Sequence, residues 1–106
     1  MTNKVFLRSF MTLDTSQLKD LEISIADRIY IQVASWNLYL GDAGLAKALA
    51  IECNAKLDLG ASDAAIKALE SLQVSLAGGS TSLPLARLVP PAQLYDLEEI
   101  LTPYCR

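Results

Sequence analysis

Residues 15–40 contain neither glycine nor proline, and this uninterrupted run constrains the fold more than any other feature of the chain. Asp14 stands just before it and Gln17 follows three residues later, which is the pattern of a capping box at a helix N-terminus. Apolar residues then recur at steps of three and four, as on one face of an α-helix. They are Leu18, Leu21, Ile25, Ile29, Val33, Trp36 and Leu40. We therefore expect one long helix over residues 15–40, forming the spine of the fold.

A competing pattern lies in the second half of this run. Ile29, Ile31 and Val33 alternate with other residue types, and their β-branched side chains are common in strands. A single strand over the whole run would be several times the usual length of about five or six residues. We favour a helix for this reason, and residues 29–33 are where a strand competes with it most strongly.

Three further helices are expected after Gly41. Asp42 suits an N-cap position, Gly60 suits the residue that follows a helix, and Pro91 suits the first helical position. The expected helices cover residues 42–58, 62–70 and 91–102.

Between the last two of these helices the apolar period changes to two residues. Leucine and valine alternate with other residues over 72–76 and 81–85, on either side of Gly78-Gly79, which is typical of a β-hairpin. Pro84 has no N–H to donate, so its strand should lie at an edge. The expected fold class is therefore mainly α with a small β-hairpin (α+β), in the order α-α-α-β-β-α.

The length of 106 residues suits one domain that buries roughly 65% of its surface. We expect a single helical domain over residues 13–106, with the hairpin at about 72–85. Residues 1–12 are either an N-terminal arm or a mis-assigned start, because Met11 directly precedes the capping signal. The side chains expected to be largely buried are Ile25, Ile29, Trp36, Leu49, Leu69, Val74, Leu85, Leu97 and Leu101.

The residue types in the chain exclude several chemistries. There is no histidine, so Ser-His-Asp and Cys-His catalysis are impossible within the chain. Cys53 and Cys105 match no zinc spacing and suit a reducing compartment. We expect a buried thiol in a helix and a thiol near the end of the chain, with a disulfide or redox pair as the alternative.

Two weaker patterns also favour a non-catalytic interpretation. Glu98 and Glu99 should point to different helix faces, because successive helical residues lie about 100° apart. Gly78-Gly79 lacks the Lys-Ser/Thr ending of a phosphate-binding loop. We therefore assign no catalytic, cofactor-binding or metal-binding residues.

The charge pattern bears on the class of partner. Nine basic and twelve acidic residues give a net charge of −3, and the basic residues are scattered rather than clustered as in nucleic-acid-binding proteins. The longest charge-free runs are residues 29–41 and 71–86, and both are shorter than the roughly 20 residues of a bilayer span. We expect no nucleic-acid partner and no integral membrane insertion.

Tyr30, Trp36 and Tyr39 form the most distinctive cluster in the sequence. Trp36 falls on the apolar face of the expected helix, so core packing with polar edges at the surface explains the cluster well. The alternative is a patch that contacts a partner, because tyrosine and tryptophan are over-represented at interaction hot spots.

Two blocks of sequence carry a family resemblance. The longer block is Tyr30-Ile31-x-Val33-Ala34-x-Trp36-x-Leu38-Tyr39-Leu40-x-Asp42-Ala43. The shorter block is Leu83-Pro84-Leu85-Ala86-x-Leu88-Val89-Pro90, leading into Asp96-Leu97. They resemble a small cyanobacterial family of uncharacterised proteins that carries a thylakoid label. Ser35 and Asn37 depart from the family pattern, in which lysine and histidine are common. The resemblance implies a cyanobacterial source and a peripheral place at the thylakoid, and it supplies no catalytic residues.

These observations leave three hypotheses. The first is a non-catalytic small binding or accessory protein that docks peripherally at the cytoplasmic face of the thylakoid through a protein partner. The second is a soluble homodimer or complex subunit with no membrane role, and the third is a small carboxylate-using enzyme. We favour the first, since the acidic charge favours a protein anchor over an anionic lipid surface. The expected protein is cytoplasmic and uses no cofactor.

Overall fold

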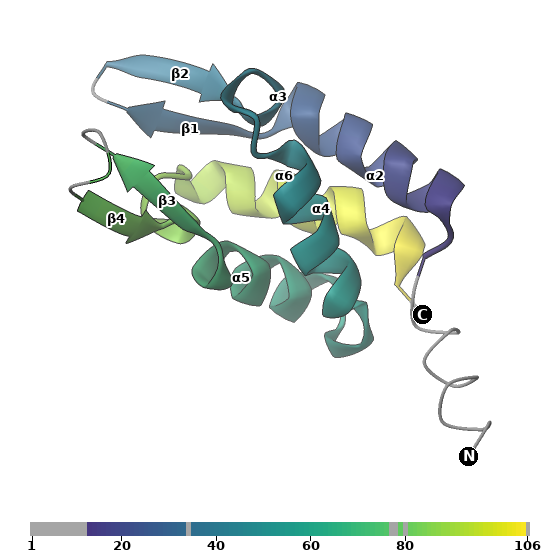
Figure 1. The fold of residues 1–106 in the computed structure, drawn as a ribbon. Helices are drawn as coiled ribbons and strands as arrows, with labels where there is room; N and C mark the ends of the chain where they lie inside the picture. The colour runs from purple at the N-terminus through teal and green to yellow at the C-terminus, as the bar shows by residue number, and fades with distance from the viewer. Residues whose placement is uncertain (1–12, 34, 77–78, 80, 106) are drawn as a thin grey trace.

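Two β-hairpins interrupt the helices in the computed structural model of the chain, which describes residues 13–33, 35–76, 79 and 81–105 (Figure 1). The elements are α2 (Thr15–Arg28), β1 (Tyr30–Val33), β2 (Trp36–Tyr39), α3 (Leu40–Ala43), α4 (Ala46–Ala55), α5 (Ala61–Ser71), β3 (Gln73–Leu76), β4 (Thr81–Pro84) and α6 (Pro91–Leu101). Both hairpins lie at one end of the molecule, on the left in Figure 1, and the helices extend away from them. The expectations for residues 1–12 fall outside the described residues.

Helix α2 begins as the sequence predicts and ends much earlier. The Gln17 N–H donates to Asp14 Oδ1 at 2.7 Å, and the Asp14 N–H donates to Gln17 Oε1 at 3.2 Å, so both halves of the capping box form. The helix stops at Arg28, and the expected continuation to residue 40 is wrong. Ile29 has extended backbone angles (φ −101°, ψ 132°) and leads directly into a strand.

The hairpin β1–β2 replaces the second half of the expected helix. Its antiparallel register pairs Tyr30 with Tyr39 and Val33 with Trp36. The alternation of β-branched residues over 29–33 therefore outweighed the helical period. In a strand Ile29, Ile31 and Val33 share one face, whereas in a helix Ile31 would point away from Ile29 and Val33.

Tertiary hydrogen bonds fix the outer edge of β1. The Gln32 N–H donates to the Leu88 carbonyl oxygen at 2.9 Å, and the Tyr30 N–H donates to Gln93 Oε1 at 2.8 Å. These partners lie more than fifty residues further along the chain. The strand is thus held by a segment that the local pattern does not reveal.

The expected helix over 42–58 is split into shorter pieces. Asp42 lies within the short helix α3 instead of capping a helix, and Gly44, with φ of +74°, separates α3 from α4. A 3-10 turn over Leu57–Leu59 follows α4. Gly41 fits closely against α2, where an added Cβ would come within 3.0 Å of Ala26 Cβ.

The remaining elements agree with the sequence. Helices α5 and α6 form near the expected ranges, and Pro91 opens α6. Strands β3 and β4 pair in antiparallel register, with Pro84 at the end of β4. Mainly α structure with small β elements is confirmed, whereas the expected order α-α-α-β-β-α lacks the first hairpin and is only roughly matched.

One hydrophobic core joins the described elements, and most of its expected members are buried. Seven of the predicted residues are at most 3% exposed: Ile25, Ile29, Leu49, Leu69, Leu85, Leu97 and Leu101. Val74 is only half-buried. Trp36 is 74% exposed, so its expected burial is wrong. It is the first residue of β2, close to the hairpin turn, instead of lying on the buried face of a helix.

Gln93 is the buried polar residue among the described core positions, with 5% of its surface exposed. Its Oε1 accepts the Tyr30 N–H, and its Nε2 donates to Asp96 Oδ2 at 2.7 Å. Buried amides are tolerated when they are hydrogen-bonded in this way. The Gln93 side chain therefore joins α6 to β1.

Replacing Gln93 with methionine should lower the free energy of unfolding by about 1–3 kcal/mol, because the Tyr30 N–H loses its acceptor. Chemical unfolding in urea measures this loss. Gln32→Met is the matched control, since the Gln32 side chain is exposed and its loss should stay within about 0.5 kcal/mol. Equal losses in both variants would show that the Gln93 amide does not hold β1.

Candidate functional site

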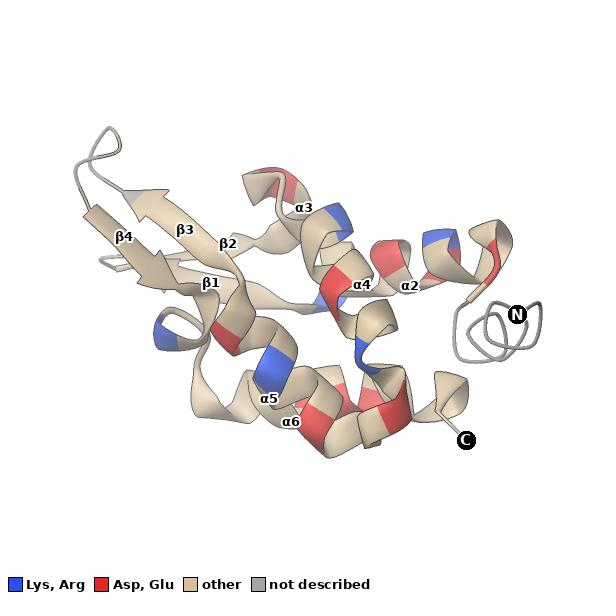
Figure 2. Ribbon diagram, turned by 60° about the horizontal axis from the view of Figure 1, so that its bottom comes forward, with Lys and Arg blue, Asp and Glu red and all other residues tan. Residues whose placement is uncertain are grey.

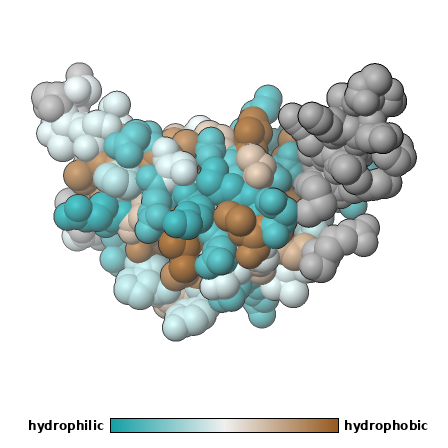
Figure 3. Space-filling view, turned by 90° about the horizontal axis from the view of Figure 1, so that it is seen from below, coloured by the Kyte–Doolittle hydropathy of each residue, from teal (hydrophilic) through white to brown (hydrophobic). Residues whose placement is uncertain are grey.

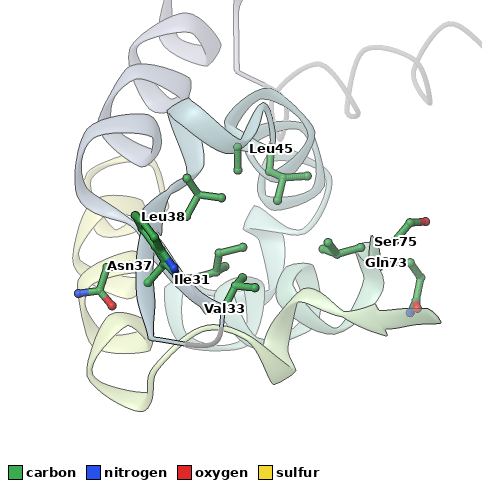
Figure 4. A pocket seen from close by; sticks show the side chains of 10 residues that line it. Ile31, Val33, Asn37, Leu38, Leu45, Gln73 and Ser75 are labelled. Carbon is green, nitrogen blue, oxygen red and sulfur yellow. The ribbon is translucent and has the colours of Figure 1, made fainter. Parts of the chain in front are cut away.

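A groove of about 550 Å³ lies between the two hairpins and is lined mainly by apolar side chains. Strand β1 contributes Ile31 and Val33, and β2 contributes Trp36 and Leu38. Figure 4 shows Ile31, Val33, Leu38 and Leu45 around the hollow. Its volume and lining are in the range of protein binding sites, which are typically about 300–1,000 Å³ and largely apolar.

The opposite side of the groove is formed by β3. Gln73, Val74 and Ser75 are its lining residues on that side. In Figure 4, Gln73 and Ser75 lie across the apolar side chains from Asn37. The groove therefore depends on both hairpins being held at one end of the fold.

The register of β1 and β2 decides which aromatic residues reach the groove. The pairs Ile31–Leu38 and Val33–Trp36 share one face of the hairpin, because side chains alternate along a strand. The pair Tyr30–Tyr39 belongs to the other face. Trp36 is thus the aromatic residue of the three that lines the groove.

Tyr30 and Tyr39 pack against each other on that other face. Their ring centroids lie 5.4 Å apart with an interplanar angle of 62°, which is an edge-to-face contact. Tyr30 is half-buried and Tyr39 is 42% exposed. The predicted patch of Tyr30, Trp36 and Tyr39 is therefore divided between two faces of one hairpin.

None of the described residues that line the groove is ionisable. The two hairpins fall within the charge-free runs 29–41 and 71–86, and Figure 2 shows their strands without acidic or basic residues. The charged residues that the structure describes lie on the helices and connecting segments instead. On the face in Figure 3, hydrophobic residues emerge in separate areas among hydrophilic ones.

Ionisable side chains form ion pairs at the surface. The Arg28 guanidinium lies 2.8 Å from Glu99 Oε1 and 3.9 Å from Asp96 Oδ1, joining α2 to α6. These groups are substantially exposed, and such pairs contribute little to stability. Among the described residues, there is no group of three acidic or cysteine side chains placed to hold a metal ion.

The two cysteines are both free thiols in the structure. Cys53 is fully buried on α4, and this burial raises the pKa of its thiol from 9.0 to about 12, although the Lys56 ammonium opposes the shift. Burial also raises the pKa of Cys105. Raised pKa values disfavour the reactive thiolate. The expected buried thiol in a helix is confirmed at Cys53.

Sequence reasoning identified Trp36 at this site but missed its other lining residues. Two signals mark them in the sequence. Ile31 and Val33 belong to the β-branched alternation, and Gln73 and Ser75 belong to the second charge-free run. If both charge-free runs are assigned to hairpins, the sequence indicates the strands that line the groove. It does not indicate that the two hairpins lie next to each other.

The fold and site define a small α+β protein with an uncharged groove between two hairpins. Residues 18–104 match the model of a family described as a protein of unknown function, DUF3181. The chain belongs to this family, and both hairpins lie within the matched range. Comparisons with the curated proteins and with the solved structures gave no match. Within the described residues, no helix has the length and apolar character needed to cross a membrane.

The exposure of Trp36 makes a prediction about stability. Trp36→Ala should lower the free energy of unfolding by less than about 1 kcal/mol, because little of the side chain is buried. Leu97→Ala, at a fully buried position, should cost about 2–5 kcal/mol. Chemical unfolding of both variants tests the difference. A loss of more than about 3 kcal/mol for Trp36→Ala would place this side chain in the core instead.

The buried thiol predicts a loss of stability in alkaline solution. An unfolded chain releases the Cys53 proton above pH 9.0, whereas the folded chain keeps it until about pH 12. The contribution of the Cys53 thiol to the free energy of unfolding is therefore fully present below pH 9.0. Above pH 9.0 it decreases by up to about 1.4 kcal/mol per pH unit.

Urea unfolding of the wild-type protein and Cys53→Ala across this range isolates the thiol from other titrating groups. The free-energy difference between the two proteins should be constant below pH 9.0 and should shift against the wild type above it. A difference that does not change with pH would contradict the burial of a neutral thiol.

Proposed function

We propose that this protein is a non-catalytic binding protein that docks on a partner protein through the groove between its hairpins. The observation that carries the proposal is a 74% exposed tryptophan at the rim of an uncharged apolar hollow. Exposed apolar surface of this kind marks interaction sites, and tryptophan is enriched at their hot spots. The polar lining residues Asn37, Gln73 and Ser75 carry amide and hydroxyl groups, which can form hydrogen bonds with a partner protein.

The proposed partner lies at the cytoplasmic face of the thylakoid membrane. The sequence resemblance to a thylakoid-labelled cyanobacterial family supports this location. The net charge of −3 and the uncharged hairpins favour contact with a protein over contact with an anionic lipid surface. In this proposal the attachment is peripheral and is made through the partner.

The test compares two exposed aromatic residues in affinity capture with the full chain as bait. Trp36→Ser alters the groove, whereas Tyr95→Ser alters a 73% exposed tyrosine on α6, outside the groove lining. The captured proteins are quantified by mass spectrometry from separate soluble and membrane fractions of the source organism. We expect a specific set of membrane-fraction proteins to be reduced at least fivefold by Trp36→Ser and unchanged by Tyr95→Ser.

Two results would contradict the proposal. If both variants capture the same proteins as the wild type, the groove does not mediate binding. If sedimentation shows a dimer that Trp36→Ser dissociates, the groove joins two copies of the chain, and the homodimer hypothesis replaces the proposal. Circular dichroism of both variants confirms that they fold.

A further inference from the structure

The backbone of β3 carries hydrogen-bonding groups that β4 does not use. The Leu85 N–H donates to the Leu72 carbonyl oxygen at 2.7 Å, which makes this pair a hydrogen-bonded one. Such pairs alternate with non-hydrogen-bonded pairs along an antiparallel ladder. The next outward positions are therefore Gln73, opposite Pro84, and Ser75, opposite Ser82. Their N–H and C=O groups point away from the hairpin.

This edge of β3 borders the groove. Three consecutive residues, Gln73, Val74 and Ser75, line it. A groove that met only one face of the strand would contact alternate residues, because successive side chains point to opposite faces. The edge of β3 at Gln73 and Ser75 therefore borders the groove, across it from the apolar floor formed by Ile31 and Val33 (Figure 4).

The other strand edges are less suited to pairing. The outer edge of β1 already donates to Leu88 and Gln93. The outer edge of β4 includes Pro84, which has no N–H. On β2, Asn37 is the outward position that lines the groove, whereas β3 offers two such positions.

We propose that the groove binds an extended segment of a partner protein as an added strand on β3. The edge would supply main-chain hydrogen bonds, and the apolar floor would accept every second side chain of the segment, as in other cases of strand addition. Four residues of β3 provide an edge of about 13 Å, enough for a partner strand of about four residues. The uncharged lining requires apolar side chains at the inward positions. This inference rests on the proposed function and adds the chemistry of the partner.

A pair of proline substitutions tests the edge directly. Ser75→Pro removes an outward N–H beside the groove, and Ser82→Pro removes the corresponding N–H at the cross-strand partner on the outer edge of β4. Neither N–H belongs to the ladder between β3 and β4, so the hairpin should form in both variants. Circular dichroism and thermal unfolding check this for the full chains.

The binding probe is a displayed library of random 12-residue peptides selected on the wild-type full chain. We expect selected peptides to carry apolar residues at alternate positions. Their Kd should rise about tenfold or more with Ser75→Pro and less than twofold with Ser82→Pro. Peptides without alternation, or equal effects of the two prolines, would overturn strand addition.

A second measurement covers a Ser75→Pro chain that fails to fold. One selected peptide is synthesised in two N-methylated forms. One form carries the methyl groups on the odd-numbered amides and the other on the even-numbered amides. One N-methylated form should lose binding to the wild-type chain and the other should keep it, because only one of the two sets of amides faces β3. Binding of both forms would overturn the proposal.

The failure of this inference and the failure of the proposed function give different results. If Trp36→Ser weakens binding of the selected peptides but Ser75→Pro does not, the groove binds partners without adding a strand. If neither substitution matters, the groove is not the binding site. If the wild-type chain forms a dimer and Ser75→Pro dissociates it, the groove is occupied by a second copy of the chain. That result would overturn the proposal of a separate partner protein.

Discussion

The hydrogen bond from the Tyr30 N–H to the Gln93 side chain is the contact on which the functional end of the molecule depends. Together with the bond from the Gln32 N–H to the Leu88 carbonyl oxygen, it fixes the outer edge of β1 against α6 and the segment that precedes it. The side chain of Gln93 is buried and also donates to Asp96, so its position is fixed from both sides. Because β1 forms the floor of the groove, these bonds determine where that floor lies.

The distribution of charge follows the division between helices and hairpins. Among the described residues, the acidic and basic side chains lie on the helices and connecting segments, while the strands carry none (Figure 2). Four short strands could have formed one sheet, but they form two separate hairpins. The groove exists because these uncharged hairpins lie at the same end without pairing with each other. An uncharged site beside the outward edge of β3 is suited to recognise backbone and apolar side chains.

The sequence predicted those parts of the fold that local chemistry determines. The Asp14 capping box, the proline at the start of α6 and the hairpin around Gly79 all formed where expected. The expected long helix was wrong beyond Arg28, because the hydrogen bonds that favour β1 come from Leu88 and Gln93, far away in the sequence. The same error placed Trp36 in the core. The sequence nevertheless indicated Trp36 as a candidate contact residue, whereas the groove around it depends on two hairpins that come together only in the folded chain.

The bond between Tyr30 and Gln93 joins residues 63 positions apart, and this separation has a consequence for synthesis on the ribosome. The hairpin β1–β2 can close early, because its strands are adjacent in the chain. It cannot reach its final position until the segment around Gln93 has been made and has left the exit tunnel. In a nascent chain the strands that line the groove are therefore made before the Gln93 side chain that holds β1 in place. The site forms only after that segment has been made and has folded, so a chain truncated before α6 would expose these uncharged strands without forming the site.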